Sequence, residues 1–480
     1  MNIKAVVRYI GMALLFNALF MFLSVLVSVL NDFDSAFSPL LLSAVITAMV
    51  GGFPLIFVRK SENLNMAEGF LVTALAWVLC CVFDMLPYVL WGGVFSLSNA
   101  WYESVSGLTT TGGTILADVE SLPKSLIFWR SSTHFIGGIG VVVFVLLVLP
   151  TVSSFGLKIS KMQISSLSMD NYRYKSRDTV KVIMLTYFGI TLLSFVFLLL
   201  AGMNAFDAVN HAMSIVSTGG FSTKNLSIMH YDSFPIELVC NVFMFISALH
   251  FGLIYAFFVD RSTKLFRSPV TIYYTGYVIV ASLFVALSLK FGEDPVPWGK
   301  ALRDSFFQVI SLSSTTGFAT ADTSRWPLFA ILILVFTTLQ GACSGSTAGG
   351  IKTDRILIFF KAIKAQIVKQ LHPQAVVRVK SGNSIIDEST VSSVALFIVL
   401  YLLIVFVIGL MLSLTGLDFV DSMSASMAAM SNCGPGFGNC NSLANYDFFT
   451  PFGKFLLGVE MLLGRLEIYG FLVLLILRKR

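Results

Sequence analysis

The composition of this chain of 480 residues excludes a soluble globular protein. Hydrophobic residues make up 56% of the chain and charged residues 12%, whereas about a quarter of the residues of a soluble domain are charged. We interpret the formal net charge of +6 as a signal of membrane topology and not of nucleic-acid binding, because the cations gather in a few loops.

Apolar runs long enough to cross a bilayer, which takes about 20 residues, recur along the whole chain. The first run follows Lys4 and Arg8, but it is too long for a signal peptide and has no small-residue cleavage site, so we expect a retained helix. The ten expected spans are 9–30, 39–58, 69–93, 133–150, 181–202, 235–258, 272–291, 326–343, 392–415 and 451–477.

Basic residues predict which side of the membrane each loop faces, because Lys and Arg accumulate in cytoplasmic loops. They gather in loops 151–180 and 259–271 and in the tail 478–480, whereas the opposite loops hold acidic residues such as Asp118 and Glu120. We therefore expect a multi-pass protein with both termini in the cytoplasm.

Each outward connection from the third span onward contains a weakly apolar segment that is too short to cross. These segments run at about 97–108, 205–216, 302–313 and 419–430. Each ends in a small polar cluster: TTTGG (109–113), STGGF (217–221), STTGF (314–318) and SNCGPGF (431–437). Because the clusters recur at intervals of roughly a hundred residues, they indicate an internal repeat of span, short helix, polar turn and span.

Further positions align when Gly112, Gly220, Gly317 and Gly434 are taken as register points. Thirteen residues before the four glycines stand residues of N-cap type: Asn99, Asp207, Asp304 and Asp421. Six residues before the first three glycines stand serines: Ser106, Ser214 and Ser311. We therefore take these four residues as candidate N-caps of the short helices.

A short helix that enters the membrane and stops halfway favours a cation at its end. Non-helical backbone at this depth is tolerated only where it is buried in protein or lines a wet cavity. The negative end of the helix dipole points toward the membrane centre, and carbonyl groups of the following turn can replace the water shell of an ion. A single cluster would suggest an ordinary glycine-ended helix C-cap, but four in register favour an ion filter.

We call the four clusters turns 1 to 4, and their residues are the candidate potassium-binding residues of a filter. Turn 1 is Thr109, Thr110, Thr111 and Gly112, turn 2 is Ser217, Thr218, Gly219 and Gly220, turn 3 is Ser314, Thr315, Thr316 and Gly317, and turn 4 is Ser431, Asn432, Cys433 and Gly434. In turn 4, Asn432 and Cys433 replace hydroxyl residues, so we expect that quarter to rely more on backbone oxygens.

The four turns resemble those of the Trk/Ktr/HKT superfamily of potassium transport proteins, and the two additional N-terminal spans are most similar to the TrkH branch. The resemblance implies an all-α polytopic membrane protein with ten transmembrane helices and four re-entrant pore helices in a pseudo-fourfold repeat. It also implies a bacterial inner-membrane location, K⁺ as the transported and filter-bound ion, and no organic cofactor. Glycine at the first register position, Gly112 here, implies preference for potassium over sodium.

The expected organisation has five parts. Residues 1–62 form two accessory helices, and pore repeats 1 to 4 occupy 63–160, 161–265, 266–385 and 386–480.

The stretch GACSGSTAGGIKTDR, 341–355, interrupts the inner half of the eighth expected span. It is not a phosphate-binding loop, because Ile351 separates glycine from lysine, and no base stands near for a serine nucleophile. At roughly 1.5 Å per residue it lies about 22 Å below the outer helix end, beneath the turns. The resemblance implies a gate, and a kink or small-residue packing site is the alternative. We call its candidate residues the inner loop: Ser344, Gly345, Ser346, Thr347, Ala348, Gly349 and Gly350.

Arg465 is the deepest cation that we expect in any span, and an intramembrane charge suggests function by default. The resemblance implies that it faces the pore near the inner loop and hinders cation flow. The alternatives are a salt bridge to Glu460 or Glu467, or snorkelling toward the inner face. Cys433 and Cys440 face outward, and the sequence leaves open whether they pair.

No catalytic constellation was found, so we expect a transport protein and not an enzyme. The resemblance implies a homodimer that sits on a ring of a TrkA-like regulatory protein with nucleotide-binding (RCK) domains, with the lipid bilayer as surroundings and no nucleic-acid partner. The predicted function is potassium-selective uptake through a channel-like pore. The alternative is a secondary transporter that couples potassium to sodium or protons, which would show paired broken helices and midplane carboxylates; we expect only one broken span.

Overall fold

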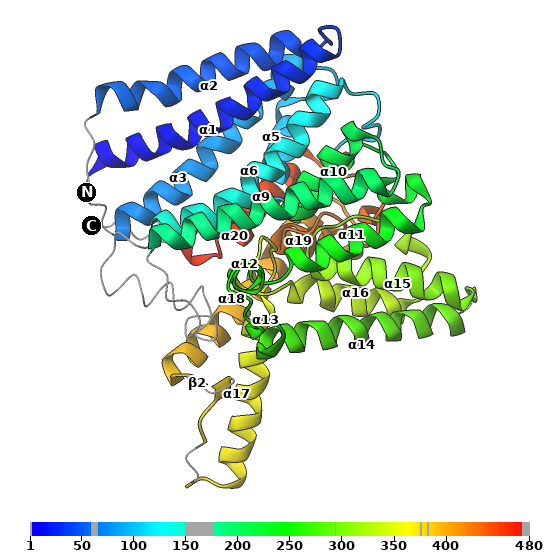
Figure 1. The fold of residues 1–480 in the computed structure, drawn as a ribbon. Coiled ribbons are helices and arrows are strands. Elements are labelled where there is room, and N and C mark those ends of the chain that lie inside the picture. Colours follow the sequence, from blue (N-terminus) through cyan, green and yellow to red (C-terminus); the bar gives the residue numbers. More distant parts are fainter. Residues whose placement is uncertain are drawn as a thin grey trace.

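The protein is almost entirely helical (Figure 1). The computed structural model describes residues 2–58, 66–148, 176–292, 294–374, 377–381 and 384–472. Within these ranges the β-structure consists of one antiparallel pair of two-residue strands, β1 (Lys380–Ser381) and β2 (Ser384–Ile385). The expected all-α class agrees with this. Basic loop residues 151–175 and the tail 478–480 lie outside the described residues.

Two N-terminal helices, α1 (Ile3–Leu30) and α2 (Phe37–Phe57), lie side by side along one edge of the molecule (Figure 1). They approach closely at two glycines, because a β-carbon on Gly11 would lie within 3.0 Å of the carbonyl oxygen of Gly51. Small residues permit this kind of contact between membrane helices. α1 also packs against α3 and α6, and Asn17 donates a hydrogen bond to Asp84 at 2.8 Å.

The rest of the chain contains four similar units, each with a short helix between two longer elements. The first has α3 (Met66–Asp84), α4 (Leu86–Trp91), α5 (Leu97–Leu108) and α6 (Lys124–Val148). The second has α9 (Ser176–Leu200), α10 (Ala205–Ser217), η1 (Ser227–Tyr231), α11 (Phe234–Ser247), α12 (Phe251–Phe258) and α13 (Lys264–Arg267). The third has α14 (Pro269–Phe291), α15 (Trp298–Ser313), η2 (Thr323–Arg325), α16 (Leu328–Gln340) and α17 (Thr353–Leu371). The fourth has α18 (Glu388–Ser413), α19 (Phe419–Ser431), η3 (Gly438–Cys440) and α20 (Pro451–Arg465).

The four units close into a ring. The helix after each turn packs against the short helix of the next unit: α6 against α10, α11 against α15, α16 against α19, and α20 against α5. The last contact joins the fourth unit to the first. This cyclic arrangement brings the C-terminal ends of α5, α10, α15 and α19, and hence the four turns, to a common centre.

Several helices are suited to crossing a membrane. Among the described residues, six helical stretches are long and apolar enough, and the bent pair α11 and α12 makes a seventh. The number of ten spans remains a prediction, since α16 is a shorter apolar helix. The fourth expected span began at 133, but α6 begins at Lys124, so Arg130 lies inside the helix.

The sixth expected span, 235–258, is not one continuous helix. α11 ends at Ser247 and α12 begins at Phe251, and the two axes differ by 104°. His250 caps the second piece, because its Nδ1 accepts a hydrogen bond from the backbone of Gly252 at 3.0 Å. The expectation that only the eighth span is broken is therefore wrong. Ser247, His250 and Gly252 interrupt the apolar run at this point.

Three short helices begin where the expected segments begin and α15 begins four residues earlier, but the N-cap residues differ from the predicted ones. Their N-cap residues are Ser96, Asn204, Pro297 and Asp418. The predicted N-caps Asn99, Asp207 and Asp421 therefore stand at the third helical position, and Asp304 lies in the second turn. In three of the helices, both the observed N-cap residue and the third helical residue are polar. In α10 the two are bonded, because the Asn204 side chain accepts a hydrogen bond from the backbone of Asp207 at 2.8 Å.

Helix α17 projects away from the bundle and lies beside the start of α18 and the β1–β2 pair (Figure 1). It follows the inner loop directly, so any displacement of α17 acts on that loop.

Candidate functional site

The four turns share one backbone conformation. The second residue of each turn has a positive φ, between 50° and 57°: Thr110, Thr218, Thr315 and Asn432. The last glycine also has a positive φ in turns 1 to 3, between 81° and 87°. Non-glycine residues rarely adopt positive φ, so four at one register position indicate a conformation that the surroundings impose.

The glycines at the ends of the turns close a ring in the order 1, 2, 3, 4. A β-carbon on Gly112 would lie within 3.0 Å of the carbonyl oxygen of Gly219 in turn 2, and Gly220 meets the backbone of turn 3 in the same way. A β-carbon on the last glycine of turn 3 would lie within 3.0 Å of the proline after turn 4. A β-carbon on the last glycine of turn 4 would lie within 3.0 Å of the backbone of Gly112. Each turn therefore touches the next, and glycine is the residue that leaves room for the neighbouring backbone.

Serines of the short helices hold the first three turns from behind. Each serine hydroxyl donates to the carbonyl oxygen of the residue directly after its turn: Ser106 to Gly113 at 2.5 Å, Ser214 to Phe221 at 2.8 Å and Ser311 to Phe318 at 2.7 Å. These are the serines that align in the sequence six residues before the register glycines. The alignment thus corresponds to one structural contact that is repeated three times.

Turn 4 is held differently. The Asn432 side chain donates to Thr111 Oγ1 at 3.2 Å and to the carbonyl oxygen of Met461 at 2.9 Å. The hydroxyl of Tyr446 donates to the carbonyl oxygen of Gly434 at 2.8 Å. The asparagine that replaces a hydroxyl residue therefore links turn 4 to turn 1.

All sixteen candidate residues of the turns are buried, except for the partly exposed last glycines of turns 1 to 3. On the outer side, a cavity of about 100 Å³ is lined by the last glycine of every turn. The C-terminal ends of four helix dipoles, each negative, converge on the turns. Partly buried backbone carbonyls at such a place suit a cation that has lost its water.

The inner loop lies directly against turns 2, 3 and 4. The Thr347 hydroxyl donates to the carbonyl oxygen of Val216, just before turn 2, at 2.9 Å. The backbone of Gly349 donates to Thr315 Oγ1 in turn 3 at 2.8 Å, and a β-carbon on Gly349 would lie within 3.0 Å of the carbonyl oxygen of Ser431. The loop therefore covers the inner side of the ring.

The first two residues of the inner loop are anchored to two different helices. The backbone and hydroxyl of Ser344 donate to one oxygen of Asp354 in α17, at 3.0 and 2.6 Å. The backbone of Phe251 in α12 donates to the carbonyl oxygen of Gly345 at 3.1 Å. Gly345 and Gly350 have positive φ, whereas Gly349 does not. The loop is thus connected to the bend of the second unit as well as to α17.

Arg465 stands at the end of α20 and is buried. Its guanidinium donates to the carbonyl oxygen of Thr347 at 2.6 Å and to that of Gly137 in α6 at 3.3 Å. The alternative of a salt bridge to Glu460 or Glu467 is not found, because Glu467 pairs with Arg355 and Glu460 accepts from Ser426. Arg465 therefore ties the inner loop to the first unit.

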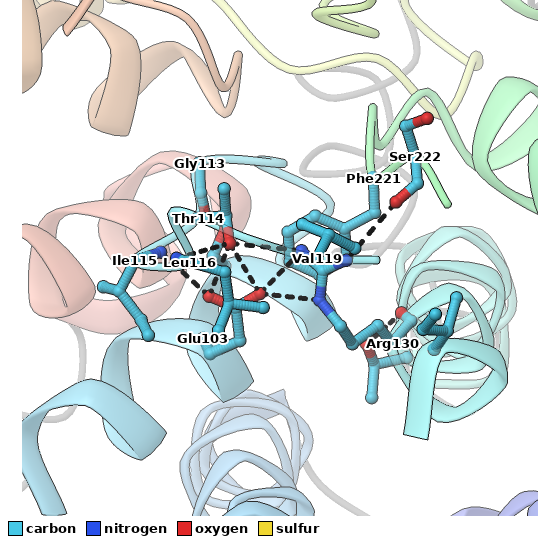
Figure 2. Close-up of polar contacts among 12 residues, drawn as sticks. Glu103, Gly113, Thr114, Ile115, Leu116, Val119, Arg130, Phe221 and Ser222 are labelled. Atoms are coloured by element: carbon cyan, nitrogen blue, oxygen red, sulfur yellow. Dashed lines mark hydrogen bonds and ion pairs between the residues drawn. The ribbon is translucent and has the colours of Figure 1, made fainter. Parts of the chain in front are cut away.

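The sequence analysis missed a buried ion pair behind turn 1. Arg130 of α6 lies 2.7 Å from Glu103 of α5, and both side chains are almost fully buried (Figure 2). The expected fourth span begins at 133 and leaves Arg130 outside the helix that contains it. A signal was available: Glu103 stands nine residues before Gly112, where the other repeats have His211, Gln308 and Ala425.

The outer face carries polar contacts that lie away from the turns. Arg303 pairs with Glu237 at 2.6 Å and is partly exposed. The hydroxyl of Tyr231 donates to Asp207 at 2.8 Å. Burial, together with this carboxylate, raises the pKa of Tyr231, so the phenol remains a hydrogen-bond donor at physiological pH.

The side chains of Cys433, Cys440 and His134 are all buried. Cys433 and Cys440 are both buried and free. His134 is buried with its ring 4.1 Å from that of Phe221. Within the part of the chain that the structure describes, no cluster of three or more His, Cys, Asp or Glu side chains is suited to hold a metal ion.

Comparisons with known proteins agree with this architecture. The model of the TrkH family, described as cation transport protein, matches residues 39–479. The Trk system potassium uptake protein TrkH of Halomonas elongata is 33% identical over 99% of this chain and 98% of its own length, and TrkG of Escherichia coli is 34% identical over 90% of this chain and 89% of its own. The crystal structure of the potassium transporter TrkH from Vibrio parahaemolyticus superposes with a TM-score of 0.89 at 30% identity, and the match covers 99% of each chain.

Proposed function

The chain belongs to the TrkH family of cation transport proteins, and we propose that it takes up potassium through a channel-like pore whose filter is the ring of four turns. The family assignment confirms the resemblance inferred from the turns, as well as the expectation that this multi-pass membrane protein is not an enzyme. The observation that carries the proposal is the closed ring, in which each turn contacts the next through a glycine. Its units are repeats 63–160, 161–265, 266–385 and 386–480, after the accessory helices of 1–62.

Potassium binds in this proposal to backbone carbonyl and hydroxyl oxygens of the turns. These oxygens replace the water shell of the ion, while the negative ends of α5, α10, α15 and α19 offset the cost of removing that water. The left-handed residue in each turn lets neighbouring carbonyls face the same side of the chain. In this proposal, the turns bind potassium without any acidic side chain.

Selectivity follows from the close packing of the ring. Contacts of Gly112 and Gly220 with neighbouring backbones limit how far the turns can move inward. A ring that cannot contract leaves the smaller sodium ion with carbonyl oxygens too distant to replace its water, although field strength of the carbonyls also contributes to selectivity.

The inner loop is the gate in our proposal, and Arg465 holds it closed. Its hydrogen bonds to Val216 and Thr315 and the bond from Arg465 to Thr347 must break before an ion can pass. A net cost of roughly 0.5–1.5 kcal/mol for each neutral bond is within the range that a regulatory partner can supply. Both α17 and the bend between α11 and α12 are connected to the loop and can transmit such a change.

We place the protein in the bacterial inner membrane with both termini in the cytoplasm. In this orientation the membrane potential drives potassium inward with about 2.3 kcal/mol per charge for each 100 mV. We further propose a homodimer that binds a TrkA-like regulatory ring with nucleotide-binding (RCK) domains through its cytoplasmic face. The resemblance of the turns and the relatives' membership of Trk systems support these partners.

The second candidate is a secondary transporter that couples potassium to sodium or protons. The bend of 104° between α11 and α12, together with the break after α16, gives two discontinuous spans, and such helices are typical of coupled transporters. The sequence analysis expected one broken span, so the second one is an additional observation in favour of the coupled transporter.

Cation flux into liposomes that contain only the purified chain distinguishes the two. Potassium, rubidium and sodium are compared with no other ion gradient imposed. Passive flux that prefers potassium supports the pore. Flux that requires a sodium or proton gradient would contradict it and favour the coupled transporter.

A further inference from the structure

We infer that Arg130 is a positioning residue for ion selectivity, which together with Glu103 fixes turn 1 against turn 2. This inference rests on the proposed function of the ring as an ion filter. It concerns residues behind the ring and not the ion-binding oxygens themselves.

The position of Glu103 has equivalents in all four repeats, nine residues before the register glycines: Glu103, His211, Gln308 and Ala425. All four residues are buried in their short helices. The first three reach the segment that follows their own turn. Glu103 accepts from Thr114 Oγ1 at 3.0 Å and from the backbone of Ile115 at 3.1 Å.

The contact becomes weaker around the ring. His211 Nε2 lies 2.9 Å from the hydroxyl of Ser222, and the Gln308 amide donates to the carbonyl oxygen of Ala321 at 3.2 Å. Ala425 has no polar side-chain atom. Glu103 therefore has two hydrogen-bond donors in the segment after its turn, His211 and Gln308 have one contact each, and Ala425 has none.

Glu103 differs from the others because it has a charged partner from another helix. The Arg130 guanidinium lies 2.7 Å from the carboxylate and donates to Thr114 Oγ1 at 3.2 Å. Charge-assisted hydrogen bonds are the stronger kind. The carboxylate, the hydroxyl and the guanidinium therefore fix the chain directly after turn 1 (Figure 2).

The same guanidinium reaches the second repeat. Its centre lies 4.0 Å above the ring of Phe221, and its remaining nitrogen donates to the carbonyl oxygen of Ser222 at 3.4 Å. Phe221 and Ser222 directly follow turn 2. One planar group thus holds the exits of two turns at a fixed separation, as Figure 2 shows for the labelled residues.

Stability alone is a poor explanation for this pair. Burying two charges costs desolvation energy that their attraction often fails to recover, and well-packed apolar residues of similar volume are often at least as stable. A pair in the wall of a filter has another use, because it holds carbonyl groups at set positions. The planar fork of arginine suits this role and the point charge of lysine does not.

The test compares two substitutions with a matched control in the liposome flux assay. Arg130→Lys keeps the charge but removes the planar fork. We expect the potassium-to-sodium permeability ratio to fall about tenfold, because two guanidinium nitrogens contact the carboxylate and the group is stacked on Phe221. Thr114→Val keeps the ion pair and removes only the hydroxyl between its members, and we expect a fall of roughly threefold. Arg303→Lys makes the same chemical change in the outer pair with Glu237, which contacts no turn, and should leave the ratio unchanged.

The thermal unfolding midpoint of each purified variant accompanies every flux measurement. If the wild-type chain itself shows no preference for potassium, the proposed function fails. If the wild type is selective and folded Arg130→Lys and Thr114→Val keep its ratio, the inference about Arg130 is overturned. If Arg130→Lys does not fold, Thr114→Val decides alone, since an unchanged ratio in that variant also overturns the inference.

Discussion

The ring of turns and the inner loop are both rich in glycine, serine and threonine, yet they are held in different ways. The glycines of the ring contact the backbone of neighbouring turns, and serines behind the turns bond to main-chain oxygens. The inner loop is attached to the ring by the hydroxyls of Thr347 and Thr315 and by one close backbone approach, of Gly349 to turn 4. Arg465 ties the loop to α6. In the proposed function, a similar composition therefore serves a packed filter in one place and a releasable gate in the other.

If the ring is the filter and the inner loop the gate, as we propose, selectivity and gating can be changed separately. A change in the ring should then alter which ion passes, because the positions of the carbonyls change. A change in the inner loop should alter how much passes, because the proposed gate obstructs the inner side without coordinating the ion. The following predictions test this separation.

The largest effect is expected for Gly112→Ser or Gly220→Ser. Each new side chain meets the backbone of the next turn at a position with positive φ, and strain together with overpacking costs roughly 3 kcal/mol. We expect the potassium-to-sodium permeability ratio to fall by about a hundredfold, measured as flux into liposomes. The control is Gly276→Ser in α14, where nothing lies within 4 Å of the new β-carbon. Unchanged ion preference in the ring variants would refute the filter assignment.

Deletion of residues 345–349 should have the next largest effect and should act on flux alone. The deletion removes the two neutral bonds from Thr347 and Gly349 to the ring, at roughly 1 kcal/mol each, and releases Arg465 from the loop. We expect potassium flux to rise about thirtyfold with an unchanged potassium-to-sodium ratio. A change in the ratio without a rise in flux would show that the loop belongs to the filter and not to a gate.

The positions of the short helices illustrate what the sequence does predict. The expected segment 97–108 coincides with α5, and 205–216 lies within one residue of α10, because four aligned copies locate each helix better than one copy would. The same alignment identified the serines that bond behind turns 1 to 3. Repetition therefore compensates for the weak apolar character of these segments.

Contacts between different repeats were not predictable in this way. Arg130 and Glu103 lie on separate helices, and pairing them requires knowing that α6 begins as early as Lys124. The bend at His250 was also missed. A histidine and a glycine mark the position, but the backbone at the bend bonds to the distant inner loop, from Phe251 to Gly345. Both features depend on tertiary contacts that a single apolar sequence does not reveal.

Substitution of Arg465 by glutamine should release the inner loop only in part. The bond to the carbonyl oxygen of Thr347 is lost, and a hydrogen bond from a charged group contributes roughly 1.5–3 kcal/mol, while Thr315 still holds Gly349. We expect flux to rise about tenfold at constant ion preference. Lys454→Gln serves as the control, because Lys454 lies in the same helix but pairs with Asp447 at its outer end. Equal effects of the two substitutions would argue against a gating role for Arg465.

The smallest effect is expected for Thr347→Val, which removes the hydrogen bond to Val216 at 2.9 Å and the long one from Thr218 at 3.4 Å, both neutral. A net loss of roughly 1 kcal/mol corresponds to about a fivefold rise in flux. Thr191→Val removes a hydroxyl that bonds within α9 and should change flux little. Because valine keeps the shape of threonine, a rise in flux would show that these bonds hold the loop against the ring. A loss of potassium selectivity instead would mean that loop and ring form one structure, and the separation between packed filter and releasable gate would fail at the point where the two regions touch.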